Sequence, residues 1–170
     1  MRIRWYGSDL KKERAEVPVY LELKSREGFA SSKQRRKFSV PRQLLNPASL
    51  HKGILDKTTI AQTLASFGHF LEKPVRPVIL ISYHRYRFSE MQTGQRVSFD
   101  NDIRATVVAA DLGRKTGEVR LENGVIEVKG PSIDLPVTLR RLRWLDIDWS
   151  RFSKYGNCLD AYFSRTWDIY

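Results

Sequence analysis

Residues 19–26 read VYLELKSR, and charged and apolar side chains alternate along them with a period of two. The same alternation recurs in RIRWYG at 2–7, ISYHRYRF at 81–88, QRVSF at 95–99 and VIEVK at 125–129. Because successive side chains of a β-strand point to opposite faces, each segment predicts a strand with one apolar and one polar face. These strands decide the fold class, since they predict a mainly antiparallel sheet.

The polar faces of the predicted strands are mostly basic. We expect one sheet, whose polar side carries Arg2, Arg4, Glu22, Lys24, Arg26, Arg85, Arg96, Glu127 and Lys129. The apolar side would carry Ile3, Trp5, Leu21, Leu23, Val97, Phe99, Ile126 and Val128. A polar face normally mixes both signs of charge for solubility, whereas cations dominate here. This excess indicates an anionic partner.

Length and charge agree with that expectation. The chain has 170 residues, which suits a single domain over 1–170. It carries 30 Lys and Arg against 19 Asp and Glu, a net charge of +11, which favours an anionic ligand. The single cysteine excludes an internal disulfide and fits a cytoplasmic location. No stretch reaches the roughly 20 apolar residues of a membrane span, and no signal peptide is seen.

The remaining segments complete an α+β prediction, with helices on the apolar side of the sheet. Residues 33–40 (KQRRKFSV) predict a strand that Pro41 ends, with basic residues on both faces. A helix is expected at 58–71, with Thr58 or Thr59 as its N-cap and His69 inside it. Asn123 and Gly124 predict a hairpin between strands at 119–121 and 125–129. A further strand is expected at 104–109, and further helices are expected at 135–145 and 155–163.

Arginine pairs on these strands suit a linear polyanion. Arg2 with Arg4 and Arg85 with Arg87 stand two residues apart, which puts two guanidinium groups on one face about 7 Å apart. That spacing matches successive phosphoryl groups. A single pair is more typical of a solvated basic edge, but the pattern is repeated on several strands. If the sheet curves or closes, the cations converge in a lumen of low dielectric constant.

Glu22 and Glu127 are the carboxylates of the predicted basic face. They are either ion-pair partners of Lys24 and Lys129 or ligands of a divalent metal, because a carboxylate beside phosphates is the usual ligand of Mg²⁺. The pattern leaves both interpretations open. The histidines lack metal-ligand spacing, and His84 would point away from the basic face.

RFSKYG, at residues 151–156, precedes the last predicted helix. Backbone N–H groups at a helix start bind anions, so Arg151, Ser153 and Lys154 form a candidate phosphate site. The alternative is an ordinary N-cap in which Ser153 caps the helix and Lys154 is solvated. The absence of a Gly-rich P-loop argues against a Walker-type nucleotide site.

Taken in order, these segments resemble the VTC (polyphosphate polymerase) domain, a branch of the CYTH-like triphosphate-tunnel superfamily. The matching pieces are RIRWYG, YLELK, KQRRKF, SYHRYRF, QRVSFD, VIEVK, a helix with Leu135 and Pro136, and FSKYG. The resemblance implies an antiparallel β-barrel around a basic tunnel, with helices packed outside. The family's first strands would precede RIRWYG, so it also implies an N-terminally truncated barrel.

The resemblance further implies a reaction and its residues. Polymerases of this family transfer the γ-phosphoryl group of ATP to polyphosphate with Mn²⁺ or Mg²⁺, chemistry that suits a site of cations without a nucleophile. The implied catalytic cations are Arg2, Arg4, Lys24, Arg85, Arg96 and Lys129. The implied substrate-binding residues are Glu22, Lys33, Arg35, Arg36, Tyr83, Arg151, Ser153 and Lys154. Glu127 is the implied metal ligand.

Three other functions stay open beside the polymerase. One is a non-catalytic polyphosphate-binding module, and another is an inorganic triphosphatase of the same fold. Nucleic-acid binding ranks lowest, because the glutamates of the basic face would repel a nucleic-acid backbone, so we expect no nucleic-acid partner. Enzymatic activity is expected if the barrel is complete, and a homo-oligomer or a partner chain are both open as ways to complete it.

Overall fold

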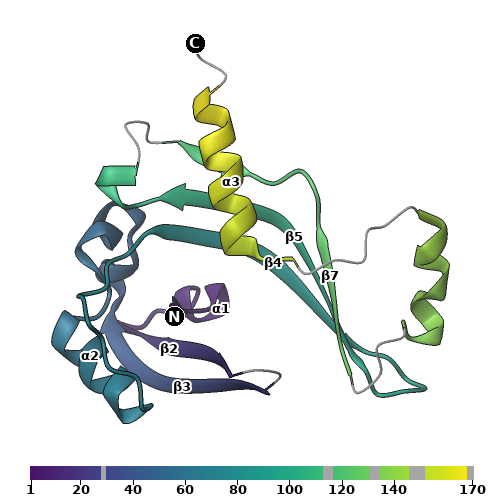
Figure 1. Cartoon of the computed structure of the whole chain (residues 1–170), viewed down its shortest axis with the longest axis horizontal. Coiled ribbons are helices and arrows are strands. Elements are labelled where there is room, and N and C mark those ends of the chain that lie inside the picture. The colour runs from purple at the N-terminus through teal and green to yellow at the C-terminus, as the bar shows by residue number, and fades with distance from the viewer. Residues whose placement is uncertain (28–29, 113–116, 131–134, 146–151, 168–170) are drawn as a thin grey trace. The chain divides into compact units, whose positions relative to one another are not determined.

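The computed structural model describes residues 1–27, 30–112, 117–130, 135–145 and 152–167. Their contacts divide the chain into two compact units, residues 1–78 with 108–110 and residues 79–107 with 111–170. Each unit has its own antiparallel sheet (Figure 1). The predicted α+β class is therefore confirmed. The prediction that all the basic strands share one sheet is wrong, and neither sheet closes into a barrel within the described residues.

The first unit contains a three-stranded sheet in the order β1-β2-β3. Its elements are β1 (Arg2–Arg4), α1 (Gly7–Leu10), β2 (Glu16–Glu27), β3 (Ala30–Pro41), the 3-10 helices η1 (Arg42–Leu45) and η2 (Pro47–Lys52), and α2 (Lys57–Ser66). Val17, Val19 and Val40 are buried together with Leu45, and Ile3 and Trp5 pack against them. Ile3 and Trp5 belong to the predicted apolar face, as does the fully buried Leu21, so that face is confirmed for this sheet.

Helix α2 is shorter than the sequence predicts and begins earlier. Its N-cap is Asp56, whose carboxylate accepts hydrogen bonds from the N–H of Thr59 at 2.8 Å and from the Thr59 hydroxyl. The helix ends at Ser66, because Gly68 has a φ of 81° and redirects the chain. His69 therefore lies beyond the helix in which it was predicted.

The second unit contains β4 (Ile79–Ser89), β5 (Arg96–Val107), β6 (Glu118–Arg120) and β7 (Val125–Lys129). Its helices are η4 (Val137–Leu145), a 3-10 helix, and α3 (Lys154–Trp167). The short η3 (Ala110–Leu112) lies where the two units meet along the chain. None of the described helices has the length and apolar character needed to span a membrane.

A bulge in β5 decides which side chains share a face of the second sheet. Arg85 pairs with Asp100 and Ile81 pairs with Ala105, so β5 has one residue more than β4 between these points. Asp102 lies in this stretch with a φ of 49°, a conformation that Asp tolerates better than most residues. The extra residue puts the apolar Ile103 and Ala105 on the same face as Asp100.

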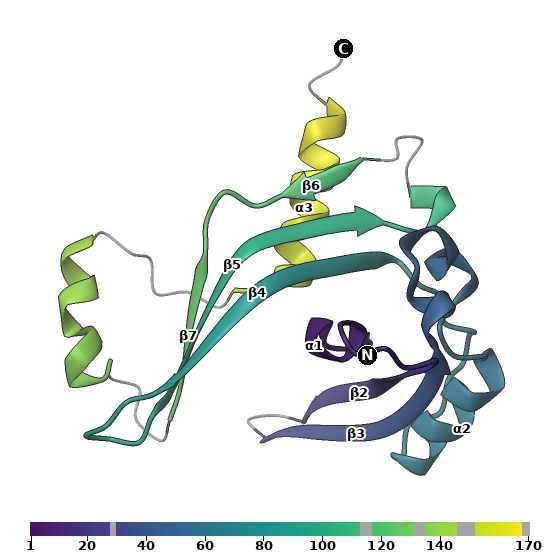
Figure 2. The same ribbon diagram turned by 180° about the vertical axis from the view of Figure 1, so that it is seen from behind.

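The predicted hairpin at Asn123 and Gly124 does not form. β6 and β7 do not pair with each other, because both pair with β5 along the same side, β6 beyond the bulge and β7 before it. Figure 2 shows the two strands following each other along β5. Gly124 lies between them against Phe99, where a Cβ atom would come within 2.7 Å of the Phe99 ring.

Helix α3 lies across one face of the second sheet (Figure 1). Cys158 is fully buried there with Ile103 and Ala105, and Ile79, Ile81 and Tyr83 pack around them. Because of the bulge, this covered face continues along the strands into the polar face of Arg85 and Asp100. The prediction that helices cover the apolar face of Val97 and Phe99 is thus wrong for α3.

Candidate phosphate-binding sites

Asp100 is the centre of the polar face in the second unit. Its side chain is completely buried and accepts two hydrogen bonds from Arg85, at 2.5 Å from Nε and 2.6 Å from Nη2. Lys154 Nζ lies 2.6 Å from Oδ2, the oxygen that also accepts the hydrogen bond from Arg85 Nη2. Burial alone would raise the pKa of Asp100, but the hydrogen bonds from Arg85 and Lys154 outweigh it and hold the pKa below its ordinary value. Asp100 is therefore an anion that fixes two cations.

The two cations that Asp100 fixes are themselves largely withdrawn from water. Only 18% of the Arg85 side chain and 19% of Lys154 is exposed. The Tyr83 ring lies below both, 5.3 Å from the Arg85 guanidinium carbon and 5.1 Å from Lys154 Nζ. The hydrogen bonds to Asp100 raise the pKa of Arg85 above its already high ordinary value. Arg85 therefore stays charged, and Asp100 holds both side chains in one geometry.

Glu127 lies next to this group and is more accessible. Its Oε1 is 3.1 Å from Lys129 Nζ and its Oε2 is 3.4 Å from Arg85 Nη2, and 38% of the side chain is exposed. Burial would raise the pKa of Glu127, but Lys129 and the charges of Arg85 and Lys154 lower it below the ordinary value. The ion-pair interpretation of Glu127 with Lys129 is confirmed. Arg96 is opposite Lys129 in the register and so adds a cation to this face.

The start of α3 brings Lys154 to Asp100. The Ser153 hydroxyl accepts a hydrogen bond from the N–H of Gly156 at 3.2 Å, which makes Ser153 the N-cap of the helix. The alternative of a solvated Lys154 is wrong, since Lys154 pairs with Asp100. Arg151 lies outside the described residues. The polar face of the second unit thus gathers Tyr83, Arg85, Arg96, Glu127, Lys129 and Lys154 from the predicted set.

Glu22 has the corresponding position in the first unit. Only 3% of its side chain is exposed, and its Oε2 lies 2.7 Å from Arg2 Nε and 2.6 Å from Arg2 Nη2. Lys33 Nζ lies 3.0 Å from Oε1, and Arg35 Nε lies 3.8 Å from it. Burial would raise the pKa of Glu22, but Lys33 and Arg2 outweigh it and lower the pKa. Its partners are therefore Arg2, Lys33 and Arg35, rather than the predicted Lys24.

The other predicted cations of the first unit divide between the two faces of its sheet. Arg4 is opposite Tyr20 and Lys24 is opposite Lys33, which places both on the face of Glu22. Arg36 is opposite Leu21, on the other face, where its guanidinium carbon lies 5.9 Å from the Phe67 ring. Arg36 is therefore separated from the Glu22 group. The side chain of Arg26 lies outside the described part of the chain.

Asp100 is the residue that sequence reasoning missed. The signal was present in the hairpin of RYRF and QRVSFD, because antiparallel pairing sets Arg85 opposite Asp100. The pattern of cations along single strands does not indicate a carboxylate partner on the neighbouring strand.

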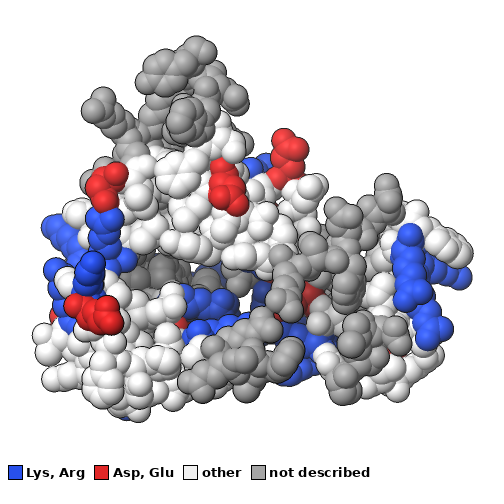
Figure 3. Space-filling model, in the orientation of Figure 1, with Lys and Arg blue, Asp and Glu red and all other residues white. Residues whose placement is uncertain are grey.

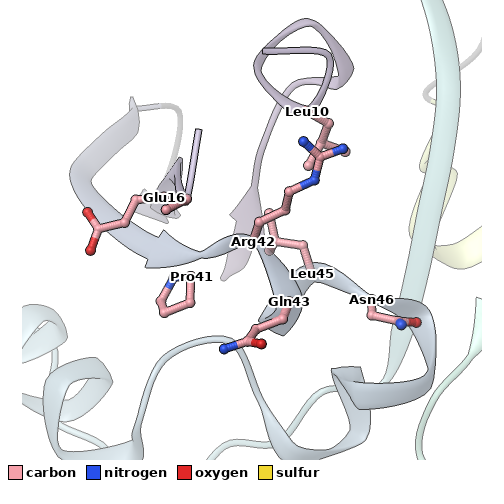
Figure 4. Close-up of a pocket in the computed structure, with 8 residues that line it drawn as sticks. Leu10, Glu16, Pro41, Arg42, Gln43, Leu45 and Asn46 are labelled. Carbon is pink, nitrogen blue, oxygen red and sulfur yellow. The ribbon is translucent and has the colours of Figure 1, made fainter. Parts of the chain in front are cut away.

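A pocket of about 810 Å³ in the first unit contains none of the predicted residues. Figure 4 shows Arg42 extending beside Leu10, with Glu16, Pro41 and Gln43 nearby. The Arg42 guanidinium donates a hydrogen bond to the Lys12 carbonyl at 3.3 Å, so it has a local structural role.

Glu127 is the described carboxylate that best fits a divalent metal. Mg²⁺ and Mn²⁺ usually take one or two carboxylates and complete their shell with phosphate oxygens and water. Asp100 and Glu22 are buried beneath cations, whereas Glu127 is partly open and its contact with Arg85 is long. In the described part of the chain no group of three or more His, Cys, Asp or Glu side chains is placed to hold a metal ion by itself. Glu127 fits as a single protein ligand.

Comparison with known proteins gives one match. The family model of the VTC domain matches residues 1–163, a range that runs through both units and every group described above. No curated protein and no solved structure matches this chain. Because the family model covers almost the whole sequence, this chain belongs to the VTC domain family.

Proposed function

We propose that this chain is a polyphosphate polymerase domain, which transfers the γ-phosphoryl group of ATP to a polyphosphate chain. Membership of the VTC family points to a function related to polyphosphate. The observation that carries the more specific proposal is the fixed pair of Arg85 and Lys154, each bonded to the buried Asp100. Two oriented cations, with Glu127 and Lys129 beside them, suit a multiply charged phosphate chain.

The reaction requires the protein to align the two phosphate substrates and to neutralise their negative charge. A terminal oxygen of polyphosphate attacks the γ-phosphorus of ATP, the bond from that phosphorus to the β,γ-bridging oxygen breaks, and ADP leaves. Arg85 and Lys154 would stabilise the charge that shifts toward the leaving oxygen, because Asp100 holds them in place before the substrate arrives. Lys129 and Arg96 would hold the neighbouring phosphoryl groups. A Mn²⁺ or Mg²⁺ ion, held by Glu127, would supply further charge neutralisation.

The proposal includes the tunnel of the family. Family membership supports an antiparallel barrel. In each sheet taken by itself, a buried carboxylate anchors cations on the polar face. Each of these polar faces suits a linear polyphosphate.

The test is polyphosphate synthesis from ATP. Purified protein is incubated with ATP and Mn²⁺, and ADP release is measured together with polyphosphate chain length on gels. We expect both products, and we expect both to fall strongly in Arg85→Gln. Arg104→Gln is the matched control, because Arg104 pairs with Asp102 and Glu118 on the opposite face of the same sheet. Release of orthophosphate without polymer would indicate a triphosphatase and contradict the polymerase.

A non-catalytic polyphosphate-binding module is the second candidate. The observation that favours it is that both oxygens of Glu127 already pair with cations, Oε1 with Lys129 and Oε2 with Arg85. In this case polyphosphate binds tightly with or without a divalent metal, Glu127→Ala leaves the binding unchanged, and ATP is not consumed.

A further inference from the structure

Helix η4 presents a basic outer surface. Its sequence, VTLRRLRWL, is wound with three residues per turn, so side chains three positions apart form rows along it. Leu139 and Leu142 belong to one row and are partly buried. The other two rows are exposed and carry Arg140, Arg141 and Arg143. Trp144 belongs to one of these rows and is 82% exposed. Figure 3 shows a column of Lys and Arg over this helix.

The tip of the β4–β5 hairpin adjoins this helix. Thr138 and Leu139 line an open pocket of about 440 Å³ together with Phe88, Met91 and Val97. Thr138 also bonds to the side chain of Glu90 in the hairpin turn. The hairpin tip and η4 therefore form one end of the second unit (Figures 1 and 2).

This end of the unit exposes an unusual amount of apolar surface. Met91, at the hairpin tip, is 97% exposed, and Phe88 is also exposed. On η4 the exposed apolar residues are Val137, Trp144 and Leu145. We call these five residues, with Arg140, Arg141 and Arg143, the hairpin–η4 surface. Large apolar side chains with cations among them are typical of a surface that binds something, rather than of one that faces only water.

We propose that the hairpin–η4 surface docks on a bilayer of anionic phospholipid. At such an interface Trp and Leu enter the boundary between headgroups and acyl chains, while arginines pair with lipid phosphates. A nucleic acid or an acidic peptide would pair with the three arginines but would leave Met91, Val137 and Leu145 in water. A bilayer covers both kinds of side chain, so it fits this surface best.

The position of the surface leaves the phosphate-binding face free. Phe88 and Val97 are paired across β4 and β5 on the face opposite Arg85 and Asp100. Docking through η4 therefore does not compete with ligands of the Asp100 group, and the inference does not depend on the proposed catalytic activity.

The test uses vesicles of phosphatidylcholine with and without phosphatidylglycerol, in the absence of ATP. We expect the full chain to co-sediment with the anionic vesicles, weakly with the neutral ones, and less as salt increases. Replacing Arg140, Arg141 and Arg143 by Gln should lower the partition coefficient roughly a hundredfold. The matched control replaces Lys52, Lys57 and Lys73, exposed in the first unit, by Gln and removes the same charge.

Insertion of Trp144 is the second readout. Brominated acyl chains should quench part of the tryptophan fluorescence in the wild type, and this part should be lost in Trp144→Phe. Equal loss of vesicle binding in the lysine control would overturn the proposal, because net charge alone would then explain binding. The absence of binding to anionic vesicles would overturn it too, as would an arginine variant that loses only polyphosphate binding.

Discussion

The two sheets anchor their cations in different ways. In the second unit, Asp100 is fully buried and its partners Arg85 and Lys154 are less than one-fifth exposed. In the first unit, Glu22 is almost as buried, but its partners Arg2, Lys33 and Arg35 are 55%, 49% and 39% exposed. The Asp100 group is therefore rigid and partly desolvated, whereas the Glu22 group keeps its cations in water and free to adjust. A fixed pair suits a reacting phosphoryl group, whereas adjustable cations suit an anion that binds in more than one geometry.

The largest loss of folding stability is expected from Asp100→Asn. It removes the charge that compensates two poorly solvated cations, and breaking a buried ion pair in this way costs about 3 kcal/mol or more of the free energy of unfolding. Urea unfolding of the full chain measures it. The matched control is Asp102→Asn on the same strand, since Asn also tolerates the positive φ and the arginine partners of Asp102 are exposed. Equal losses in the two variants would contradict a special role for Asp100.

Glu22→Gln should have a smaller effect, about 1–2 kcal/mol, because water solvates its cations when the charge is removed. In the same variant we expect polyphosphate to bind at least as tightly, since Arg2 and Lys33 lose a competing carboxylate. The control is Glu16→Gln, an exposed residue on the same face of β2. A loss of polyphosphate affinity in Glu22→Gln would show that Glu22 positions its cations as rigidly as Asp100 does.

Ser153→Ala should cost about 1 kcal/mol, because it removes the N-cap of α3 and loosens the turn that carries Lys154. The cations of Glu22 described above lie on strands β1 and β3, so this variant tests a feature of the second unit. Ser164→Ala, at an exposed position of the same helix, is the control and should be neutral or slightly stabilising. Equal melting temperatures for the two variants would contradict the capping role.

The smallest effect on stability is expected when the pH is lowered into the mildly acidic range. Ion pairs lower the pKa of Glu22, so its contribution to stability is complete above its ordinary value of 4.5 and is lost as the pH falls through the folded-state value. The stability gap between wild type and Glu22→Gln should therefore narrow below pH 4.5. For Asp100→Asn the gap should begin to narrow only below the ordinary Asp value of 3.8. A gap that widens in acid would contradict both assignments.

The sequence was sufficient to predict the strands and most of the cations of both groups. Alternation identified β2, β4, β5 and β7, and the order of the segments identified the family. The sequence was insufficient where one extra residue in a strand shifts its pairing register with the neighbouring strand. The bulge at Asp102 reverses which residues of β5 face α3. The alternation of charged and apolar residues with a period of two does not indicate this change.

Pairing between residues distant in the sequence explains the other differences between the predictions and the structure. Asn123 and Gly124 are a strong local turn signal, but both flanking strands pair with β5 instead of with each other. Arg36 belongs to a basic run, yet its parity on β3 places it on the face of Leu21. Asp100 was missed because its partners come from another strand and from a distant helix. The barrel, the metal and the cytoplasmic location stay predictions.

Titration with polyphosphate of defined length tests the central claim most directly. We predict that wild type binds it and that Arg85→Gln and Lys154→Gln each weaken binding about tenfold or more, because each removes a charged hydrogen bond to phosphate. Arg104→Gln, on the opposite face, should bind as wild type does. If the Arg85 and Lys154 variants bind unchanged, or if single-stranded RNA competes as well as polyphosphate, the anchored cations of the second sheet are not a polyphosphate site.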